Sequence, residues 1–397
     1  MTNISFIIKN ILLFLCFYNI IMHRIYFDNA ATTAIDPQVV DVMLPYLTEK
    51  FGNPSSIYSF GRETKMAIEN ARKSVAKLLN VTPGEIFFTS GGTESSNTAI
   101  NAAVRDLNCK HIITSTIEHH ATTHTVEYLE KTGQVKLSYV KLTENGHIDL
   151  KNLEELLANS TERVLVTLMH ANNEIGNLLK IKAVGELCRK YDAIFHSDTV
   201  QTLGHYPLDL KNIHVHFING AAHKFHGPKG IGVLYVNNSI SIKPFINGGS
   251  QERNMRAGTE NIYGIVGFAK ALELATERQE SDSTHIKELK SYMSEKLKEN
   301  FSAITFNGDA FGSSLYTVLN VSFPLTEKSE MLLFNLDMDG ICVSGGSACT
   351  SGANSVSHVI KAINKDTENI VPIRFSFSRH NTKDEIDQVI TKIKELL

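Results

Sequence analysis

The stretch Phe87-Phe88-Thr89-Ser90-Gly91-Gly92-Thr93-Glu94 joins an apolar run to a helical pattern through two glycines. This order is typical of a strand that ends at the N-terminus of a helix, where unpaired backbone N–H groups can bind an anion. The glycines Gly91 and Gly92 would let the backbone approach the anion, and Thr93 would add a hydroxyl donor. A plain helix cap is the alternative interpretation. The stretch is neither a Walker A motif nor a complete G-x-G-x-x-G, so nucleotide binding lacks support.

The alternation of helix and strand continues on both sides of this stretch. Apolar residues at helical spacing fill positions 62–80, and further helical patterns separate short apolar runs downstream. Such alternation predicts an α/β fold with a mainly parallel sheet covered on both faces. The predicted strands lie near residues 86–88, 111–114, 135–142, 164–169, 193–196, 215–218 and 231–236.

The composition changes beyond about residue 261. A long charged helix over roughly 269–300 precedes a strand at 317–321, a loop rich in Gly, Ser and Cys, and a last helix from Lys383. We expect a large domain over 22–260 and a smaller α+β domain over 261–397 that carries the cysteine loop. The first residues of the large domain could pack with the small one.

The charge balance excludes several classes of partner. The chain of 397 residues is 42% hydrophobic and 20% charged, which suits a folded core and not a disordered chain. Its formal net charge of -3 argues against nucleic acid or an anionic membrane as the main partner, since both require a concentrated basic surface. The 5 cysteines are sparse and odd in number, which predicts free thiols in a reducing compartment.

The N-terminal residues from Ile4 to Met22 are strongly apolar and leave three interpretations open. A signal peptide would need a positive start and a small-residue cleavage site. A membrane anchor would need roughly 20 uncharged apolar residues, and Lys9 leaves only about a dozen. The third interpretation is that Met22 is the true start, which would make residues 1–21 an extension without a folding role.

An acid and a lysine stand at the ends of two apolar runs. Asp198 follows Ile194-Phe195-His196-Ser197, and Lys224 follows Ala221-Ala222-His223. A buried Asp needs a cation or several donors, and a strand-end Lys in a cleft can act as a nucleophile. Together with the anion site, these residues suit pyridoxal 5'-phosphate (PLP), which needs an anchored phosphate, a carboxylate at the ring nitrogen and a Schiff-base lysine. Spacing alone does not distinguish Lys224 from Lys229.

From Tyr26 to about Arg379 the sequence resembles the cysteine desulfurases of the NifS/IscS type, which are PLP-dependent enzymes of fold type I in the class V aminotransferase family. The motifs are collinear with those of the family, which makes the resemblance highly specific. The matching segments are Tyr26-Phe27-Asp28-Asn29-Ala30-Ala31-Thr32-Thr33, Gly52-Asn53-Pro54-Ser55-Ser56, Glu118-His119-His120, Asn172-Asn173-Glu174-Ile175-Gly176, His223-Lys224, Arg256-Ala257-Gly258-Thr259, Ser347-Ala348-Cys349-Thr350-Ser351 and Ile373-Arg374-Phe375-Ser376.

The resemblance implies roles around the cofactor ring. Lys224 would carry PLP as a Schiff base and act as acid and base at the substrate α-carbon. His119 would stack on the ring and assist proton transfer, although it could also form a capping pair with its neighbour. Asp198 would pair with the ring nitrogen, and Gln201 and Asn173 would contact the region of the ring hydroxyl.

The resemblance also implies a phosphate site and a substrate site. Gly92, Thr93 and His223 would hold the phosphate, with Thr259 reaching in from the second subunit of a homodimer. Arg374 would clamp the substrate carboxylate with its planar fork.

Asn53 is a further candidate for substrate binding, although both Asn53 and Asn173 could simply bond loop backbone. Two residues depart from the family, because Ala221 stands where a phosphate-contacting Ser is usual and Tyr58 replaces a usual His. The chain also ends at Leu397 without the tail by which some relatives grip a scaffold protein.

Cys349 is the implied nucleophile, which would attack the sulfur of L-cysteine and leave a persulfide and L-alanine. Because a free thiol has a pKa of about 8.5, a local cation or donor should lower it. The run of small residues at 343–353 predicts a mobile loop, of the form found in the branch that hands sulfur to iron–sulfur scaffold proteins.

We therefore expect a cytoplasmic enzyme for iron–sulfur cluster assembly or other thiolation, with no membrane or nucleic-acid partner. No intrinsic metal is expected, although Cys349 could transiently share an iron–sulfur cluster. A selenocysteine lyase, or another class V aminotransferase or lyase, is the alternative.

Overall fold

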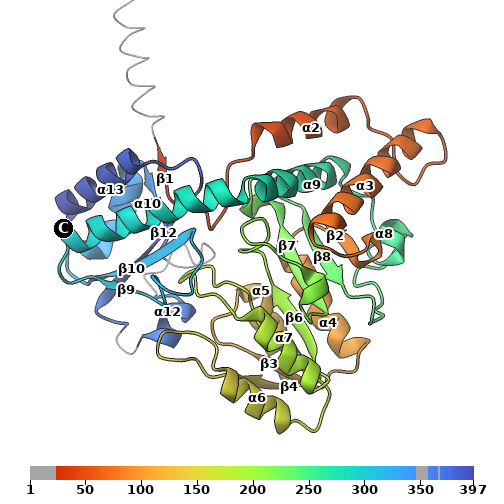
Figure 1. Cartoon of the computed structure of the whole chain (residues 1–397), viewed down its shortest axis with the longest axis horizontal. Coiled ribbons are helices and arrows are strands. Elements are labelled where there is room, and N and C mark those ends of the chain that lie inside the picture. The colour runs from red at the N-terminus through yellow and green to blue at the C-terminus, as the bar shows by residue number, and fades with distance from the viewer. Residues whose placement is uncertain (1–23, 346–355, 365–366) are drawn as a thin grey trace, which may run out of the picture.

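The computed structural model describes residues 24–345, 356–364 and 367–397, so the N-terminal extension and Cys349 lie outside the described residues. Its largest element is a seven-stranded sheet in the order β2-β8-β7-β6-β5-β3-β4 (Figure 1). Only β8 runs against the others, which confirms the prediction of an α/β fold with a mainly parallel sheet. The strands are β2 (Ile86–Thr89), β3 (His111–Thr114), β4 (Lys136–Tyr139), β5 (Val164–Thr167), β6 (Ile194–Asp198), β7 (Phe217–Ala221) and β8 (Gly232–Val236).

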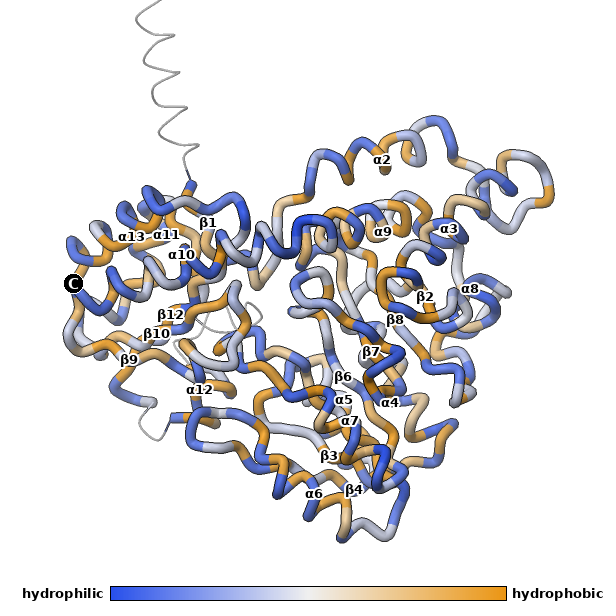
Figure 2. Tube along the Cα trace, viewed as in Figure 1, coloured by the Kyte–Doolittle hydropathy of each residue, from blue (hydrophilic) through white to orange (hydrophobic). Residues whose placement is uncertain are grey.

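Helices cover both faces of this sheet because neighbouring strand residues point to opposite sides. Ile112, Ile194 and Phe217 pack with α4 and α5, whereas the residues that follow Ile112 and Ile194 pack with the opposite core. Figure 2 shows apolar residues along the central strands and mixed hydropathy along the surrounding helices. The helices of this unit are α2 (Pro37–Thr48), α3 (Ser59–Leu78), α4 (Gly92–Arg105), α5 (His120–Lys131), α6 (Leu150–Ala158), α7 (Ile181–Lys190), α8 (Gln251–Asn254) and α9 (Ile262–Glu277).

A smaller unit has its own antiparallel sheet and core. Strand β10 lies between β12 and β9, and β1 pairs with β11. Ile25 and Phe27 belong to this core, so the first described residues pack with the small unit. The elements are β1 (Ile25–Tyr26), β9 (Thr305–Phe306), β10 (Val318–Pro324), β11 (Ile341–Cys342), β12 (Ile370–Ser376), α10 (Gln279–Asn300), α11 (Leu332–Met338), α12 (His358–Ile363) and α13 (Lys383–Leu396).

The prediction of one continuous helix over 269–300 is wrong at Arg278. The backbone there has φ -94° and ψ 0°, which separates α9 from α10. The Arg278 side chain donates to Asp36 Oδ2 at 2.6 Å. Helix α9 packs into the core of the large sheet and α10 into that of the small one, in succession along the upper side of Figure 1. A domain division after residue 260 stays a prediction.

No helix among the described residues is long and apolar enough to cross a membrane. The apolar segment that ends at Met22 precedes Arg24, the first described residue.

Candidate active site

A cavity of about 310 Å³ opens at the carboxyl ends of the parallel strands. This is the edge at which α/β sheets place their ligands. The segments that follow β2, β6 and β7 supply most of its polar wall, and β12 of the small unit supplies one arginine. The predicted site residues that line it are Gly92, Thr93, His119, Asn173, Asp198, Gln201, His223, Lys224 and Arg374.

The N-terminus of α4 forms one wall of this cavity. A Cβ atom added to Gly92 would lie 2.7 Å from Val200 Cγ2, so no larger residue fits without displacing that side chain. The cap residue Gly91 offers no side-chain acceptor to the first amides of the helix. These amides are therefore available to an anion, as the sequence predicts. Ala221 also lines the cavity, and its methyl group cannot donate a hydrogen bond to that anion.

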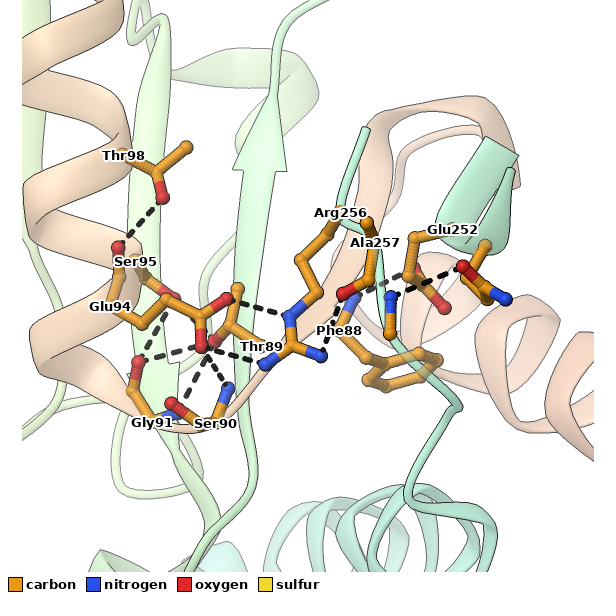
Figure 3. A network of polar contacts seen from close by, with 12 residues as sticks. Phe88, Thr89, Ser90, Gly91, Glu94, Ser95, Thr98, Glu252, Arg256 and Ala257 are labelled. Carbon is orange, nitrogen blue, oxygen red and sulfur yellow. Dashed lines mark hydrogen bonds and ion pairs between the residues drawn. The ribbon is translucent and has the colours of Figure 1, made fainter. Parts of the chain in front are cut away.

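An acid follows directly in the first turn of α4, and an arginine neutralises it (Figure 3). Arg256 donates from Nε and Nη2 to the two carboxylate oxygens of Glu94, at 2.9 and 3.1 Å. Although burial acts in the opposite direction, hydrogen bonds from Arg256 and Ser90 lower the pKa of Glu94. Glu94 is thus held as a carboxylate paired with a cation, which limits its repulsion of a neighbouring anion.

Asp198 and Lys224 lie on neighbouring strand ends. Asp198 is the last residue of β6, is buried, and accepts from the Val200 N–H at 2.9 Å. Lys224 lies in the short 3₁₀ turn 222–224 directly after β7. Its Nζ donates to the carbonyl oxygens of Ala30 and Ala31 at 2.6 and 2.8 Å. The cavity therefore contains a buried carboxylate and a primary amine held by backbone acceptors.

His119 caps a helix and also lines the cavity. It is the N-cap of α5, and its Nδ1 accepts from the Ala121 N–H at 3.1 Å. The proton of the neutral ring is thereby assigned to Nε2. Burial, assisted by Lys224 and opposed by Asp198, lowers the pKa of His119. A neutral ring with a donating Nε2–H lines the cavity.

His223 and Gln201 also contact residues 30–32, the segment that accepts hydrogen bonds from Lys224. His223 Nδ1 lies 3.2 Å from Thr32 Oγ1, and burial with the charges of Lys224 and Lys229 lowers its pKa to about 4. Gln201 Nε2 donates to the carbonyl of Ala30 at 3.1 Å. At neutral pH His223 contributes no charge of its own to the anion site.

Arg374 extends from β12 into the cavity. Its Nη1 donates to the backbone carbonyl of Asn173 at 2.9 Å, and its Nη2 donates to Asp28 Oδ1 at 2.6 Å. Its Nε is buried and has no hydrogen-bond partner among the described residues. A buried guanidinium with an unused N–H is suited to bind a carboxylate ligand.

Two predicted residues do not line the cavity. Asn53 Oδ1 accepts from the Ser55 N–H at 2.9 Å, which is the local loop bond that the sequence left as its alternative role. Thr259 lies in a separate hollow of about 210 Å³ beside Arg256. The described residues therefore contain no contact of Asn53 or Thr259 with this cavity.

The cysteines separate by environment. Cys109 and Cys188 are buried, and burial raises the pKa of Cys109 to about 12. Cys342 is half-buried, and burial, with the charges of Asp337 and Asp28, raises its pKa. Each of these three thiols is thus less acidic than an exposed one. The predicted nucleophile Cys349 lies outside the described residues.

Sequence reasoning missed Asp28 and the carbonyls of Ala30 and Ala31. These three residues lie in one turn that contacts both Arg374 and Lys224. Backbone acceptors leave no mark in a sequence. The acid was visible, in the conspicuous run that begins at Tyr26, but nothing in the pattern indicated its arginine partner 346 residues away.

The cavity fits PLP in size and in chemistry. The Gly92 cradle can accept a phosphate, Asp198 can face a ring nitrogen, and the amine of Lys224 can bond an aldehyde. No group of three or more His, Cys, Asp or Glu side chains in the described ranges is placed to hold a metal ion.

Comparison with known proteins gives consistent results. The family model of class-V aminotransferases matches residues 25–389. The curated protein "Cysteine desulfurase IscS" of Dictyoglomus turgidum is 42% identical over 377 residues, which cover 94% of each chain. A solved structure titled "NIFS-LIKE PROTEIN" is 37% identical with a TM-score of 0.86, over 94% of this chain and 98% of that chain. Another, "SspA in complex with cysteine", is 30% identical with a TM-score of 0.76, over 90% of this chain and 99% of that chain.

The matched region covers both units as far as residue 389, and it includes every described residue of the cavity wall. Members of this family depend on PLP, the cofactor that the cavity fits. The chain belongs to the class-V aminotransferase family.

Proposed function

We propose that this chain is a cysteine desulfurase, which converts L-cysteine to L-alanine and takes the sulfur onto Cys349 as a persulfide. The proposal rests on one observation: the same cavity is lined by Lys224, Asp198, His119 and Arg374. The relative named cysteine desulfurase, at 42% identity, and the similar structure titled as a complex with cysteine support L-cysteine as the substrate.

When bound, PLP supplies an electron-withdrawing ring that stabilises negative charge at the α-carbon of an amino acid. Asp198 would hold the ring nitrogen in its protonated form, and Lys224 would be the covalent attachment. The remaining residues that we assign to the cofactor are Gly92, Thr93, Asn173, Gln201 and His223 of this chain and Thr259 of a second copy.

The chain's own residues bind the substrate and move its protons. Arg374 binds the α-carboxylate and so fixes the α-carbon near Lys224. The amine of Lys224 takes the α-proton and returns one to the product. His119 lines the cavity with its Nδ1 occupied by the Ala121 N–H, which supports a role for its Nε2–H as a hydrogen-bond donor to the bound ligand.

The sulfur step needs no external oxidant or reductant. The Cys349 thiolate bonds to the substrate sulfur while the substrate C–S bond breaks. The electron pair of that bond stays with carbon, which takes a proton and becomes the methyl group of alanine. The persulfide on Cys349 is then available to an acceptor, which we propose to be an iron–sulfur scaffold protein or another thiolation partner in the cytoplasm.

A second copy of the chain is the partner that the surface supports. Large apolar side chains are exposed on α2, on α3 and on the segment between them, which is more than a monomer normally leaves in one area. These side chains are Leu44, Leu47, Phe51, Ile57, Phe60 and Met66. We infer a homodimer that covers this surface, and sedimentation of the holoenzyme tests it. A monomer at micromolar concentration would contradict the inference.

The test of the function is alanine formation from L-cysteine, with the absorbance of the bound cofactor followed in the same sample. Cys349→Ala should keep the absorbance and lose persulfide formation. Lys224→Ala should lose alanine formation altogether. If Cys349→Ala left sulfur release unchanged, the chain would act instead as a lyase that needs no thiol nucleophile.

A further inference from the structure

The ion pair of Arg374 is incomplete. Its side chain is only 2% exposed, yet it meets its acidic partner through a single contact, Nη2 to Asp28 Oδ1 at 2.6 Å. Nη1 is taken by the carbonyl of Asn173, and Nε is buried without a partner in the described part of the chain. The planar fork of an arginine can bind both oxygens of one carboxylate, and this pair does not use that capacity.

A negative charge beside a buried guanidinium nevertheless stabilises it. Glu174 is a second carboxyl that feels the charge of Arg374, and burial raises the pKa of Glu174. A carboxyl with a raised pKa is a weaker counter-ion, because its charged form is disfavoured. In the absence of a ligand, Asp28 therefore balances the charge of Arg374.

A substrate carboxylate would meet this same guanidinium, since Arg374 lines the cavity. Two carboxylates on one guanidinium lie a few ångströms apart, where their like charges repel strongly in a site that is largely buried. This repulsion is comparable to the gain from the new ion pair. Asp28 and the substrate carboxylate therefore compete for Arg374.

Asp28 can leave without a change of fold. Its backbone is held, because its carbonyl accepts from Ala31 N–H at 3.0 Å and the preceding Phe27 carbonyl accepts from Ser376 N–H at 2.7 Å. Its side chain is 18% exposed, against 2% for Arg374. Rotation of the Asp28 side chain toward solvent would release the arginine while the turn that holds Lys224 stays in place.

We propose that Asp28 is an exchangeable counter-ion, which occupies Arg374 in the ligand-free site and gives way to the α-carboxylate of the substrate or product. The inference rests on the proposed function, in which an amino acid binds this cavity. The exchange weakens ground-state binding of substrate and product, and it speeds the release of alanine by returning a carboxylate to Arg374.

The test is the equilibrium affinity of the holoenzyme for L-alanine and for ethylamine, which lacks the carboxylate, measured by calorimetry. Asp28→Asn removes the competing charge but keeps an oxygen acceptor for Arg374. We expect its Kd for L-alanine to fall about three- to tenfold and its Kd for ethylamine to stay within about twofold. Asp28→Glu keeps the charge and should match the wild type for both ligands. Asp106→Asn is the matched control, because Asp106 pairs with Arg105 at 2.7 Å outside the cavity.

A higher or unchanged Kd for L-alanine in Asp28→Asn would overturn the proposal, since it would mean that Asp28 only orients Arg374. Equal shifts for both ligands would overturn it as well. If Asp28→Asn does not fold, Asp28→Ser and a crystal structure of the wild type with L-alanine give the same decision. In that structure Asp28 should have left Nη2. Alanine formation from L-cysteine by the wild type tests the proposed function separately, so the two failures are distinguishable.

Discussion

Arg72 and Arg374 are both buried, yet they hold their carboxylate partners in different ways. Arg72 meets Glu252 through two parallel contacts, Nη1 to Oε2 at 2.7 Å and Nη2 to Oε1 at 2.8 Å. Arg374 meets Asp28 through one contact and leaves its Nε without a partner among the residues described. In the first pair, which we call the closed pair, both carboxylate oxygens bond to the guanidinium. In the second pair, the guanidinium keeps an N–H that can still bind a ligand.

The closed pair also holds a strained segment. Glu252, Arg253 and Asn254 have φ values of 44°, 57° and 65°, which are unfavourable for residues other than glycine. Glu252 Oε2 additionally accepts from the Phe88 N–H at 2.9 Å. The same segment continues to Arg256, which pairs with Glu94 beside the anion site (Figure 3). A permanent ion pair thus fixes the framework, whereas an exchangeable pair faces the ligand.

The largest effect is expected from breaking the closed pair. Glu252→Ala leaves the Arg72 guanidinium and the Phe88 N–H without their acceptor, and it should lower the free energy of unfolding by about 3–5 kcal/mol. Chemical denaturation measures this change. Glu69→Ala is the matched control, because Glu69 contacts the same Arg72 at 3.2 Å but is 40% exposed. It should cost about 1 kcal/mol or less. Equal losses in the two variants would contradict the contrast between the pairs.

Acid should act through buried histidines on the cavity side. Burial lowers the pKa of the His170 ring to about 4, and the backbone N–H of His170 donates to the Asp198 carbonyl. His170 is therefore protonated near pH 6.5 in the unfolded state but only near pH 4 in the folded state. The contribution of the neutral His170 to the free energy of unfolding is fully present above pH 6.5. It is lost as the pH falls toward 4, and the loss is about 3 kcal/mol for His170 alone. The free energy of unfolding, measured by chemical denaturation across this pH range, should depend less steeply on pH in His170→Asn. An unchanged dependence on pH would contradict the assignment to His170.

A smaller effect should follow from changing the geometry of Arg374 while keeping its charge. Arg374→Lys retains a cation for Asp28 but loses the planar fork. We expect kcat/KM for L-cysteine to fall about 10- to 100-fold, mainly through KM, with little change in the melting temperature. Steady-state kinetics measures the split. A fall confined to kcat would mean that Arg374 does not bind the ground-state carboxylate.

The smallest effect should come from the stability of Asp28→Asn. Asp28 is partly exposed and its replacement still offers an oxygen to Arg374, so the cost should be about 1 kcal/mol. The ratio of this cost to that of Glu252→Ala measures how exchangeable the Asp28 pair is. A loss as large as that of Glu252→Ala would mean that both pairs are structural.

The strands and the mainly parallel sheet could be predicted from the sequence, because apolar periodicity is a local signal. Local signals at strand ends also indicated Gly92, Thr93 and Asp198, and a lysine that spacing did not distinguish from Lys229. The other five predicted residues of the cavity wall were implied only by the family resemblance: His119, Asn173, Gln201, His223 and Arg374. The break at Arg278 could not, since helical spacing continues through it and its partner Asp36 is 242 residues away. The pairing of Arg72 with Glu252 spans 180 residues and leaves no local pattern. The acceptors for Lys224 are backbone carbonyls, which every residue has.

The most direct test of the account is the location of the sulfur after reaction with L-cysteine. The holoenzyme is mixed with L-cysteine, alkylated and digested, and the masses of the cysteine-containing peptides are measured by mass spectrometry. We predict that the Cys349 peptide gains one sulfur atom, that the Cys342, Cys109 and Cys188 peptides do not, and that Lys224→Ala abolishes the gain. Alanine formation without added sulfur on Cys349, or with the sulfur on Cys342, would contradict the account.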